Sequence, residues 1–220
     1  MKNIRKITGL VAAMALAALL MTNCTKNEDS TIILLGEEQY IDEIINVIPD
    51  SLIGVFTQYV KIHKGYIPPN IQGEYAFTPK ERVYTNATTP WPLEVVERDV
   101  MLKFSEQHNR KATFLHYEQI RTETDTVYVI GHDSYFSVYY QENVLLDYGL
   151  YEVKIKRGII YSGRLMSDGI RNLFYASIIM DVDDESNGTG AYLTQPVGTF
   201  FIYKDGDGVA EKYDWYEDEE

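Results

Sequence analysis

The residues whose types could do chemistry are few, and His116 and Glu118 form the clearest pair. They are two positions apart in a segment expected to form a strand, so both side chains lie on one face of the sheet. A histidine and a carboxylate on one face can act as a base and its partner, or supply two metal ligands. The alternative is a hydrogen-bonded pair at the surface, because the sequence offers no third ligand nearby. His63 continues an apolar helical stripe, which predicts a partly buried core histidine.

The segment of residues 203–214 comes closest to a metal loop. Asp205, Asp207, Gly208 and Asp214 fall on ligand or glycine positions of a calcium loop. The first ligand position would then be Tyr203, where such a loop needs a carboxylate. The segment is therefore a calcium loop or a plain aspartate–glycine turn. A second acidic group has the same two interpretations: Asp181, Asp183, Asp184 and Glu185.

Motifs of the common enzyme classes are absent from the sequence. There is no Gly-x-Ser-x-Gly, no His-Glu-x-x-His, no phosphate loop and no dinucleotide-binding glycine pattern. Carboxylates are abundant, so a glycosidase pair could form in space, but nothing in the sequence selects two of the 33 acids. We therefore expect no catalytic residues, no cofactor and no metal, with a hydrolase kept as the alternative.

The N-terminal segment predicts an export signal that ends in a lipid attachment site. Lys2, Arg5 and Lys6 precede an apolar run at residues 7–21, and the only cysteine, Cys24, follows Thr22 and Asn23. A transmembrane helix needs about 20 apolar residues, and this run has 15. The pattern resembles a bacterial lipoprotein signal, although most such signals carry Gly, Ala or Ser where Asn23 stands. The resemblance implies cleavage after residue 23 and acylation of Cys24, which anchors the protein to a membrane.

The charge of the chain excludes nucleic acid as an expected partner. The net charge is −13, and removal of residues 1–23 takes away three cations and no acids, which makes it −16. A phosphate backbone or an anionic lipid surface would be repelled, so the acyl group alone is expected to hold the membrane. With Cys24 acylated, no disulfide is possible. The core must therefore stabilise the fold by itself.

Hydrophobic periodicity divides the remaining chain into helical and β segments. Residues 24–36 are a linker, and apolar residues at helical spacing predict two amphipathic helices within residues 37–64. From residue 71 the period changes to two, which predicts about nine short strands. Their ranges are 71–78, 100–105, 112–121, 124–130, 135–142, 148–156, 159–165, 173–182 and 197–203.

The connections favour an antiparallel fold of one domain, residues 37–212, followed by an acidic tail at 213–220. Short turns are expected at His132-Asp133, Arg157-Gly158 and Asp168-Gly169, and a long loop at residues 79–92. Strands without intervening helices predict an antiparallel β-barrel, with a β-sandwich as the alternative. Closure into a barrel is favoured because it removes exposed strand edges.

Two stretches resemble a group of uncharacterised Bacteroidetes lipoproteins of the surface or outer membrane. They are IPDSL with GYIPPNIQGEYAF in residues 48–77, and SDGIRNLFYASIIMD with PVGTFFIYKDGDG in residues 167–208. The group implies no specific activity. In addition, Gly73-Glu74-Tyr75 at the first strand is similar to the lipocalin entry, where Gly-x-Trp occupies that place. This second resemblance implies a lipocalin-like barrel.

These observations predict a lipid-anchored, non-enzymatic protein of the outer membrane. It is expected to be exposed at the cell surface, with the periplasmic face as the alternative. Its partner would be a small ligand, a glycan or another protein, and an envelope glycoside hydrolase or a structural subunit remains the alternative. The 18 tyrosines suit half-buried sheets and also suit sugar or aromatic contacts.

Overall fold

The structure is a computed structural model that describes residues 44–87, 96–97, 99–118, 121–147, 152–184 and 195–213. The chain divides into two units, and all of these residues belong to the second, residues 40–220. The predicted signal segment, Cys24, the predicted linker and residues 214–220 lie outside the described residues. So do the side chains of residues 96–97, 118, 121–125 and 184.

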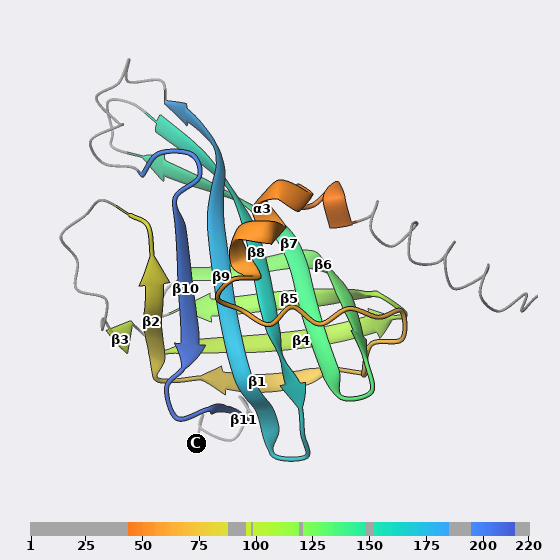
Figure 1. Cartoon of the computed structure of the whole chain (residues 1–220). Helices are drawn as coiled ribbons and strands as arrows, with labels where there is room; N and C mark the ends of the chain where they lie inside the picture. Colours follow the sequence, from red (N-terminus) through yellow and green to blue (C-terminus); the bar gives the residue numbers. More distant parts are fainter. Residues whose placement is uncertain are drawn as a thin grey trace, which may run out of the picture. The chain divides into compact units, whose positions relative to one another are not determined.

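Eight antiparallel strands close into a β-barrel (Figure 1). Consecutive strands are neighbours in a meander, and the last strand, β11, pairs with both β1 and β9, for example Tyr75 with Lys212 and Arg171 with Val209. The predicted antiparallel barrel is therefore confirmed, and the sandwich alternative is not what the chain forms. The barrel strands are β1 (Gly73–Phe77), β4 (Val100–His108), β5 (Lys111–Glu118), β6 (Arg121–His132), β7 (Tyr135–Asp147), β8 (Glu152–Leu165), β9 (Gly169–Asp184) and β11 (Val209–Lys212).

Three more strands branch from the middle of β9. β10 (Phe200–Asp205) pairs with β9, β2 (Lys80–Thr85) pairs with β10, and β3 (Val96–Glu97) pairs with β2. In Figure 1, β4 and β5 run across β7, β8 and β9, so the barrel consists of two crossed layers. We call the end where β5 joins β6, β7 joins β8 and β9 joins β10 the loop end, and the opposite end the turn end.

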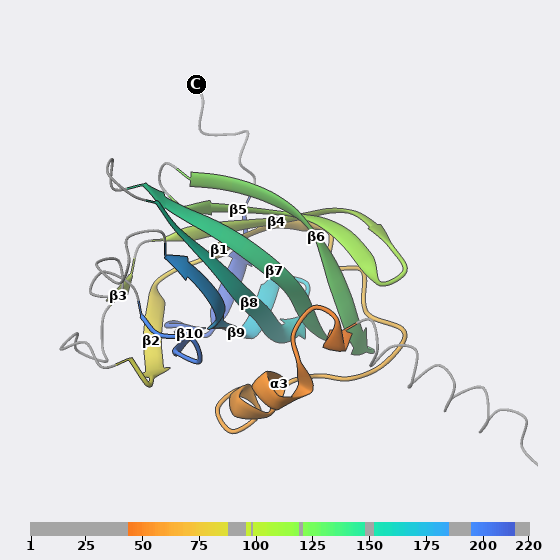
Figure 2. The same ribbon diagram turned by 90° about the horizontal axis from the view of Figure 1, so that it is seen from above.

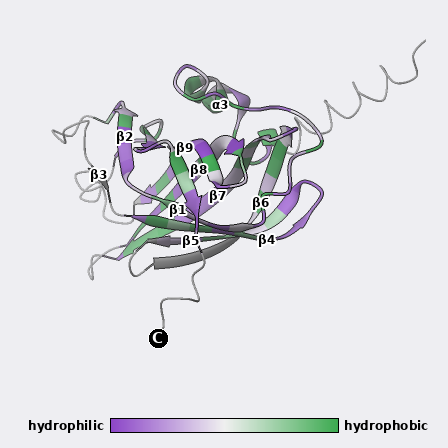
Figure 3. Cartoon of the chain, turned by 90° about the horizontal axis from the view of Figure 1, so that it is seen from below, coloured by the Kyte–Doolittle hydropathy of each residue, from purple (hydrophilic) through white to green (hydrophobic). Residues whose placement is uncertain are grey.

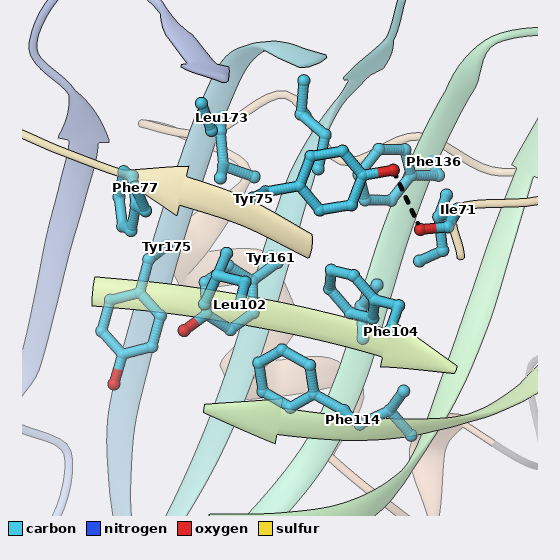
Figure 4. Packing of buried hydrophobic residues seen from close by; sticks show 14 of the residues in the cluster. Ile71, Tyr75, Phe77, Leu102, Phe104, Phe114, Phe136, Tyr161, Leu173 and Tyr175 are labelled. Atoms are coloured by element: carbon cyan, nitrogen blue, oxygen red, sulfur yellow. Dashed lines mark hydrogen bonds between the residues drawn. The ribbon is translucent and has the colours of Figure 1, made fainter. Parts of the chain in front are cut away.

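Apolar side chains from every barrel strand fill the interior. Residues alternate along the strands, as in β4, where Val100, Leu102 and Phe104 are buried and their neighbours are not. The hydropathy colouring of Figure 3 shows the same change of character along the strands. Near the turn end, Tyr75 donates a hydrogen bond from its hydroxyl to the carbonyl of Ile71 at 3.1 Å (Figure 4). This part of the interior is packed with side chains and leaves little room for a ligand.

A second hydrophobic cluster lies outside the barrel, where residues 44–66 cover β7 to β10 (Figure 2). The helix α3 (Asp50–Phe56) buries Phe56, whose ring meets Phe200 edge-on at 6.2 Å. The segment that follows continues along the barrel, and Ser162 donates to the carbonyl of Lys61 at 2.6 Å. No helix within the described ranges is both long enough and apolar enough to span a membrane.

The helical prediction is only partly confirmed. The second expected helix exists as α3, but it ends at Phe56, and His63 therefore lies in a segment without regular secondary structure rather than in a helix. The first expected helix falls mostly outside the described residues. His63 is nevertheless 9% exposed, and its ring packs at 4.7 Å from that of Tyr135, as a core histidine would. Burial and the nearby Lys61 and His132 lower its pKa.

Two of the predicted connections are wrong. Residues 152–165 form one strand, β8, without a turn at Arg157-Gly158. Gly158 serves packing instead, because a Cβ there would lie 3.0 Å from Ile48 and from the sulfur of Met180. The expected loop at residues 79–92 contains the strand β2. Its inward residues are Lys80 and Arg82, so charged side chains occupy the positions where the pattern of a strand requires apolar ones.

Candidate functional site

Four tyrosines and several charged side chains form a layer across the barrel on the loop-end side of the apolar core. We call it the tyrosine layer, and its members come from β2, β5, β7, β8, β9 and β10. The Phe114 ring connects Tyr140 and Tyr161 at 5.3 and 5.5 Å between centroids. In Figure 4 the hydroxyl of Tyr175 points away from the Tyr75–Ile71 pair. The layer consists of Lys80, His116, Tyr140, Glu142, Arg157, Tyr161, Tyr175 and Tyr203.

Tyr175 lies at the centre of this layer. Its ring is 5.0 Å from that of Tyr161 and 5.5 Å from that of Tyr203. The ammonium of Lys80 lies over two of these rings, 5.1 Å from Tyr175 and 4.6 Å from Tyr203. A cation over aromatic faces is held by the quadrupoles of the rings. These two contacts hold the charged ammonium of Lys80 in the layer, where only 5% of the residue is exposed.

An ion pair between Arg157 and Glu142 joins β8 and β7 in the same layer. The side chain of Glu142 is 7% exposed and that of Arg157 is 29% exposed. Burial by itself lowers the pKa of Arg157, but Tyr175, Glu142 and Tyr140 raise it, and the guanidinium remains charged. The pair therefore places a positive group and its counter-ion beside Tyr140 and Tyr175.

The hydroxyl of Tyr140 is the unusual group in this layer. Tyr140 is 4% exposed, and its oxygen has no hydrogen-bond partner within the described part of the chain. Burial, and then the neighbouring Tyr161, Tyr175 and Glu142, raise its pKa well above the ordinary value, so it stays protonated. The Nε of Arg157 is likewise buried without an acceptor among the described residues. Two hydrogen-bond donors thus lie in the layer with nothing shown to accept from them.

His116, singled out from the sequence, belongs to this layer. It faces the interior of the barrel, and its Nδ1 lies 3.5 Å from the hydroxyl of Tyr161. The structure does not describe the side chain of Glu118, so the expected pairing of the two stays untested. The expectation of a surface pair is wrong for His116 because the residue points inward. The His132-Asp133 turn is confirmed, with 3.1 Å between Nδ1 of His132 and Oδ2 of Asp133.

The acidic segment after β10 is a tight turn in the structure. Oδ1 of Asp205 accepts hydrogen bonds from the backbone of Gly208 and Val209, each at 3.1 Å, and Asp207 accepts from Val209 at 3.0 Å. These carboxylates hold the turn that connects β10 to β11, as the turn interpretation predicts. Asp214 lies outside the described residues. Among the residues that are described, no group of three or more His, Cys, Asp or Glu is placed to hold a metal.

Of the second acidic group, Asp181 and Asp183 lie on β9, whereas the side chain of Asp184 and all of Glu185 are outside the described residues. Asp181 is the cross-strand partner of Lys156, and Asp183 is that of Lys154. Together with residues of β7 they line a hollow of ≈440 Å³. Lysines and aspartates alternate there, so the hollow offers no excess charge of either sign to a ligand. A hollow of ≈330 Å³ at the turn end is lined by Gln107, whose amide already donates to the carbonyl of Pro69 at 2.9 Å.

Comparison of the chain with protein-family models, with curated proteins and with solved structures gave no match. The function must therefore be argued from the geometry of this chain. Sequence reasoning missed the tyrosine layer except for His116. The signal was present in the alternation of β7, where Tyr140 and Glu142 interrupt an otherwise apolar inward face that includes Phe136 and Val138.

Proposed function

We propose that the chain is a lipid-anchored envelope protein whose barrel binds a small ligand at the tyrosine layer, without catalysing a reaction on it. The observation that carries this proposal is the hydroxyl of Tyr140, which is buried and lacks a partner within the described residues. A buried polar group without a hydrogen bond costs about 1–3 kcal/mol. A bound ligand that accepts this hydrogen bond would remove that cost.

The architecture supports the same proposal. A barrel of eight strands is wide enough either to be filled by side chains or to hold one small ligand. Here side chains fill the turn end, so the ligand would enter from the loop end and stop at the tyrosine layer. The meander order of the strands is compatible with a lipocalin-like barrel, in which Tyr75 would take the place of the lipocalin tryptophan. A glycosidase would instead need two carboxyl groups about 5–10 Å apart, and Glu142 is engaged by Arg157.

A thermal-shift screen of the purified full-length protein against organic acids, alcohols and sugars tests the binding. A true ligand should raise the unfolding temperature, because binding to the folded state adds about 2.7 kcal/mol at a concentration of 100 times Kd. Tyr140→Phe should abolish that rise. Without ligand, the same variant should be at least as stable as the parent protein, because it loses a hydroxyl that has no partner.

Tyr139→Phe is the matched control for this screen. Tyr139 neighbours Tyr140 on β7, is also buried, and belongs to the outer cluster rather than to the interior. It should leave every ligand response unchanged. If no compound stabilises the parent protein, or if Tyr140→Phe lowers the stability of the free protein, the proposed site is wrong.

The anchor is tested by changing the single cysteine. We expect Cys24→Ala to abolish metabolic labelling with palmitate and to release the protein from outer-membrane fractions. The substitution removes the site where the acyl chains are attached, and these chains are needed for firm attachment to the membrane. The Tyr140→Phe variant should be labelled normally. Labelling that persists in Cys24→Ala would contradict the assignment of Cys24 as the attachment site.

A further inference from the structure

We infer that the ligand of the tyrosine layer is a small organic carboxylate with a flat apolar body, whose oxygens accept hydrogen bonds from Tyr140 and Arg157. The inference rests on the proposed function and adds the chemical class of the ligand. It follows from the kinds of hydrogen-bonding groups in the layer, from their charge and from the rings beside them.

Two of the buried polar atoms in the layer are donors for which the described residues show no acceptor. Tyr140 offers its O–H and Arg157 its Nε–H, and neither has an acceptor among the described residues. They lie on adjacent strands, since Tyr140 pairs with Ile159 and Glu142 pairs with Arg157 in one register. Side chains diagonal to each other on one face of a strand pair are near enough for one small group to contact both. A carboxylate has two acceptor oxygens and suits such a pair.

The charge of the layer favours an anion over a neutral acceptor. The guanidinium of Arg157 is partly exposed and has more donors than Glu142 can occupy. Lys80 and Arg82 bring two further cations to the inward face of β2, whatever else they contact. In a site of low dielectric, these charges strengthen a hydrogen bond to an anionic oxygen. The chain as a whole has a net charge of −13, so the group of inward cations differs in sign from the protein around it.

The surroundings favour a carboxylate over a phosphate. The walls of the layer are aromatic, with the rings of Phe114, Tyr161 and Tyr175 in contact with one another. Such walls pack against a flat apolar body. A phosphate brings a higher charge and more acceptor oxygens than two donors can serve, and its desolvation would be costly. The expected ligand therefore has one carboxylate and a planar body.

Isothermal titration of the full-length protein with four probes tests the class. Benzoate represents the expected ligand, benzyl alcohol has the same ring without the charge, and inorganic phosphate and cellobiose represent the alternatives. We expect benzoate to bind at least about tenfold more tightly than the other three, since a hydrogen bond to a charged group exceeds a neutral one by this factor. Tyr140→Phe should weaken benzoate by about tenfold, and Arg157→Lys, which keeps the charge but lacks Nε, should weaken it as well.

Tyr139→Phe serves again as the control and should leave the affinity for benzoate unchanged. Benzyl alcohol binding as tightly as benzoate, or a preference for phosphate or cellobiose, would overturn the carboxylate class and leave binding at the layer intact. Benzoate affinity that is the same in Tyr140→Phe and the parent protein would also overturn the inference. Failure of all four probes would overturn it too, and the alcohols and sugars of the thermal-shift screen then decide separately whether the proposed function survives.

Discussion

Gly169→Ala is expected to lower the free energy of unfolding by about 3 kcal/mol or more. Gly169 has a φ of +153°, and a Cβ added there would lie 2.3 Å from the carbonyl oxygen of Ala210. That oxygen belongs to the backbone of β11, the strand that closes the barrel, and Gly169 pairs with Glu211 in the same ladder. The clash cannot be relieved by rotating a side chain. The two strands must move apart.

Thermal unfolding followed by circular dichroism measures this effect. For a chain of this size, about 3 kcal/mol corresponds to a fall in Tm of roughly 6–12 °C. Gly54→Ala is the matched control, because Gly54 lies in α3 with nothing within 4 Å of an added Cβ. It should be neutral or stabilising by up to about 1 kcal/mol, since alanine favours helices. An unchanged Tm in Gly169→Ala would show that β9 and β11 do not close the barrel as described.

Asp205→Asn is expected to remove a loss of stability that the parent protein shows as the pH rises. Burial first, and then the hydrogen bond and charge of Asp207, raise the pKa of Asp205 to about 7. Asp205 is 3% exposed, and its Oδ2 has no hydrogen-bond partner apart from the Asp207 carboxyl among the described groups. Lys80 is its cross-strand partner, but the ammonium lies over the rings of Tyr175 and Tyr203.

The sign follows from the direction of the shift. The folded state holds the proton more tightly than the unfolded state, where the pKa is near 3.8. The stability from the protonated carboxyl is therefore complete below about pH 4 and is lost as the pH rises through about 7. Asparagine keeps the oxygen that accepts from Gly208 and Val209 and carries no charge. Between about pH 5 and about pH 8, we expect Asp205→Asn to gain about 2 kcal/mol relative to the parent protein.

Urea unfolding at several pH values checks this expectation. Asp133→Asn, which removes one carboxylate from the exposed turn between β6 and β7, is the control and should not reproduce the gain of Asp205→Asn. A difference between Asp205→Asn and the parent protein that does not grow from pH 5 to pH 8 would contradict the role of Asp205. A gain at low pH would contradict it as well.

The barrel could be predicted from the sequence because most of its strands alternate in the expected way. In β4 the apolar residues Val100, Leu102 and Phe104 point inward, and β7 repeats the pattern with Phe136 and Val138. The strand β2 was not predicted because its inward residues, Lys80 and Arg82, are cations. The strand β11 was not predicted because Val209–Lys212 has only four residues, most of them poor strand formers.

The candidate site was harder to predict because its members come from distant segments. Tyr140 and Tyr175 are ordinary strand tyrosines in the sequence, and only the register of β7, β8 and β9 brings them together. Gly158 is a similar case. A glycine after a charged residue is typical of a turn, but here the approach of Ile48 requires it. Contacts between segments far apart in the chain thus decided both features, and local patterns do not contain them.

Closure of the barrel by β11 has a consequence for how such a chain folds during its synthesis. One edge of the first barrel strand, β1, can pair only when β11, near the other end of the described chain, is present, since Tyr75 lies opposite Lys212. Contacts this distant in sequence form late and slowly. A polypeptide emerging from the ribosome would thus keep its barrel open until its final strand emerged. A product truncated before β11 would leave the edges of β1 and β9 exposed to proteases and to aggregation.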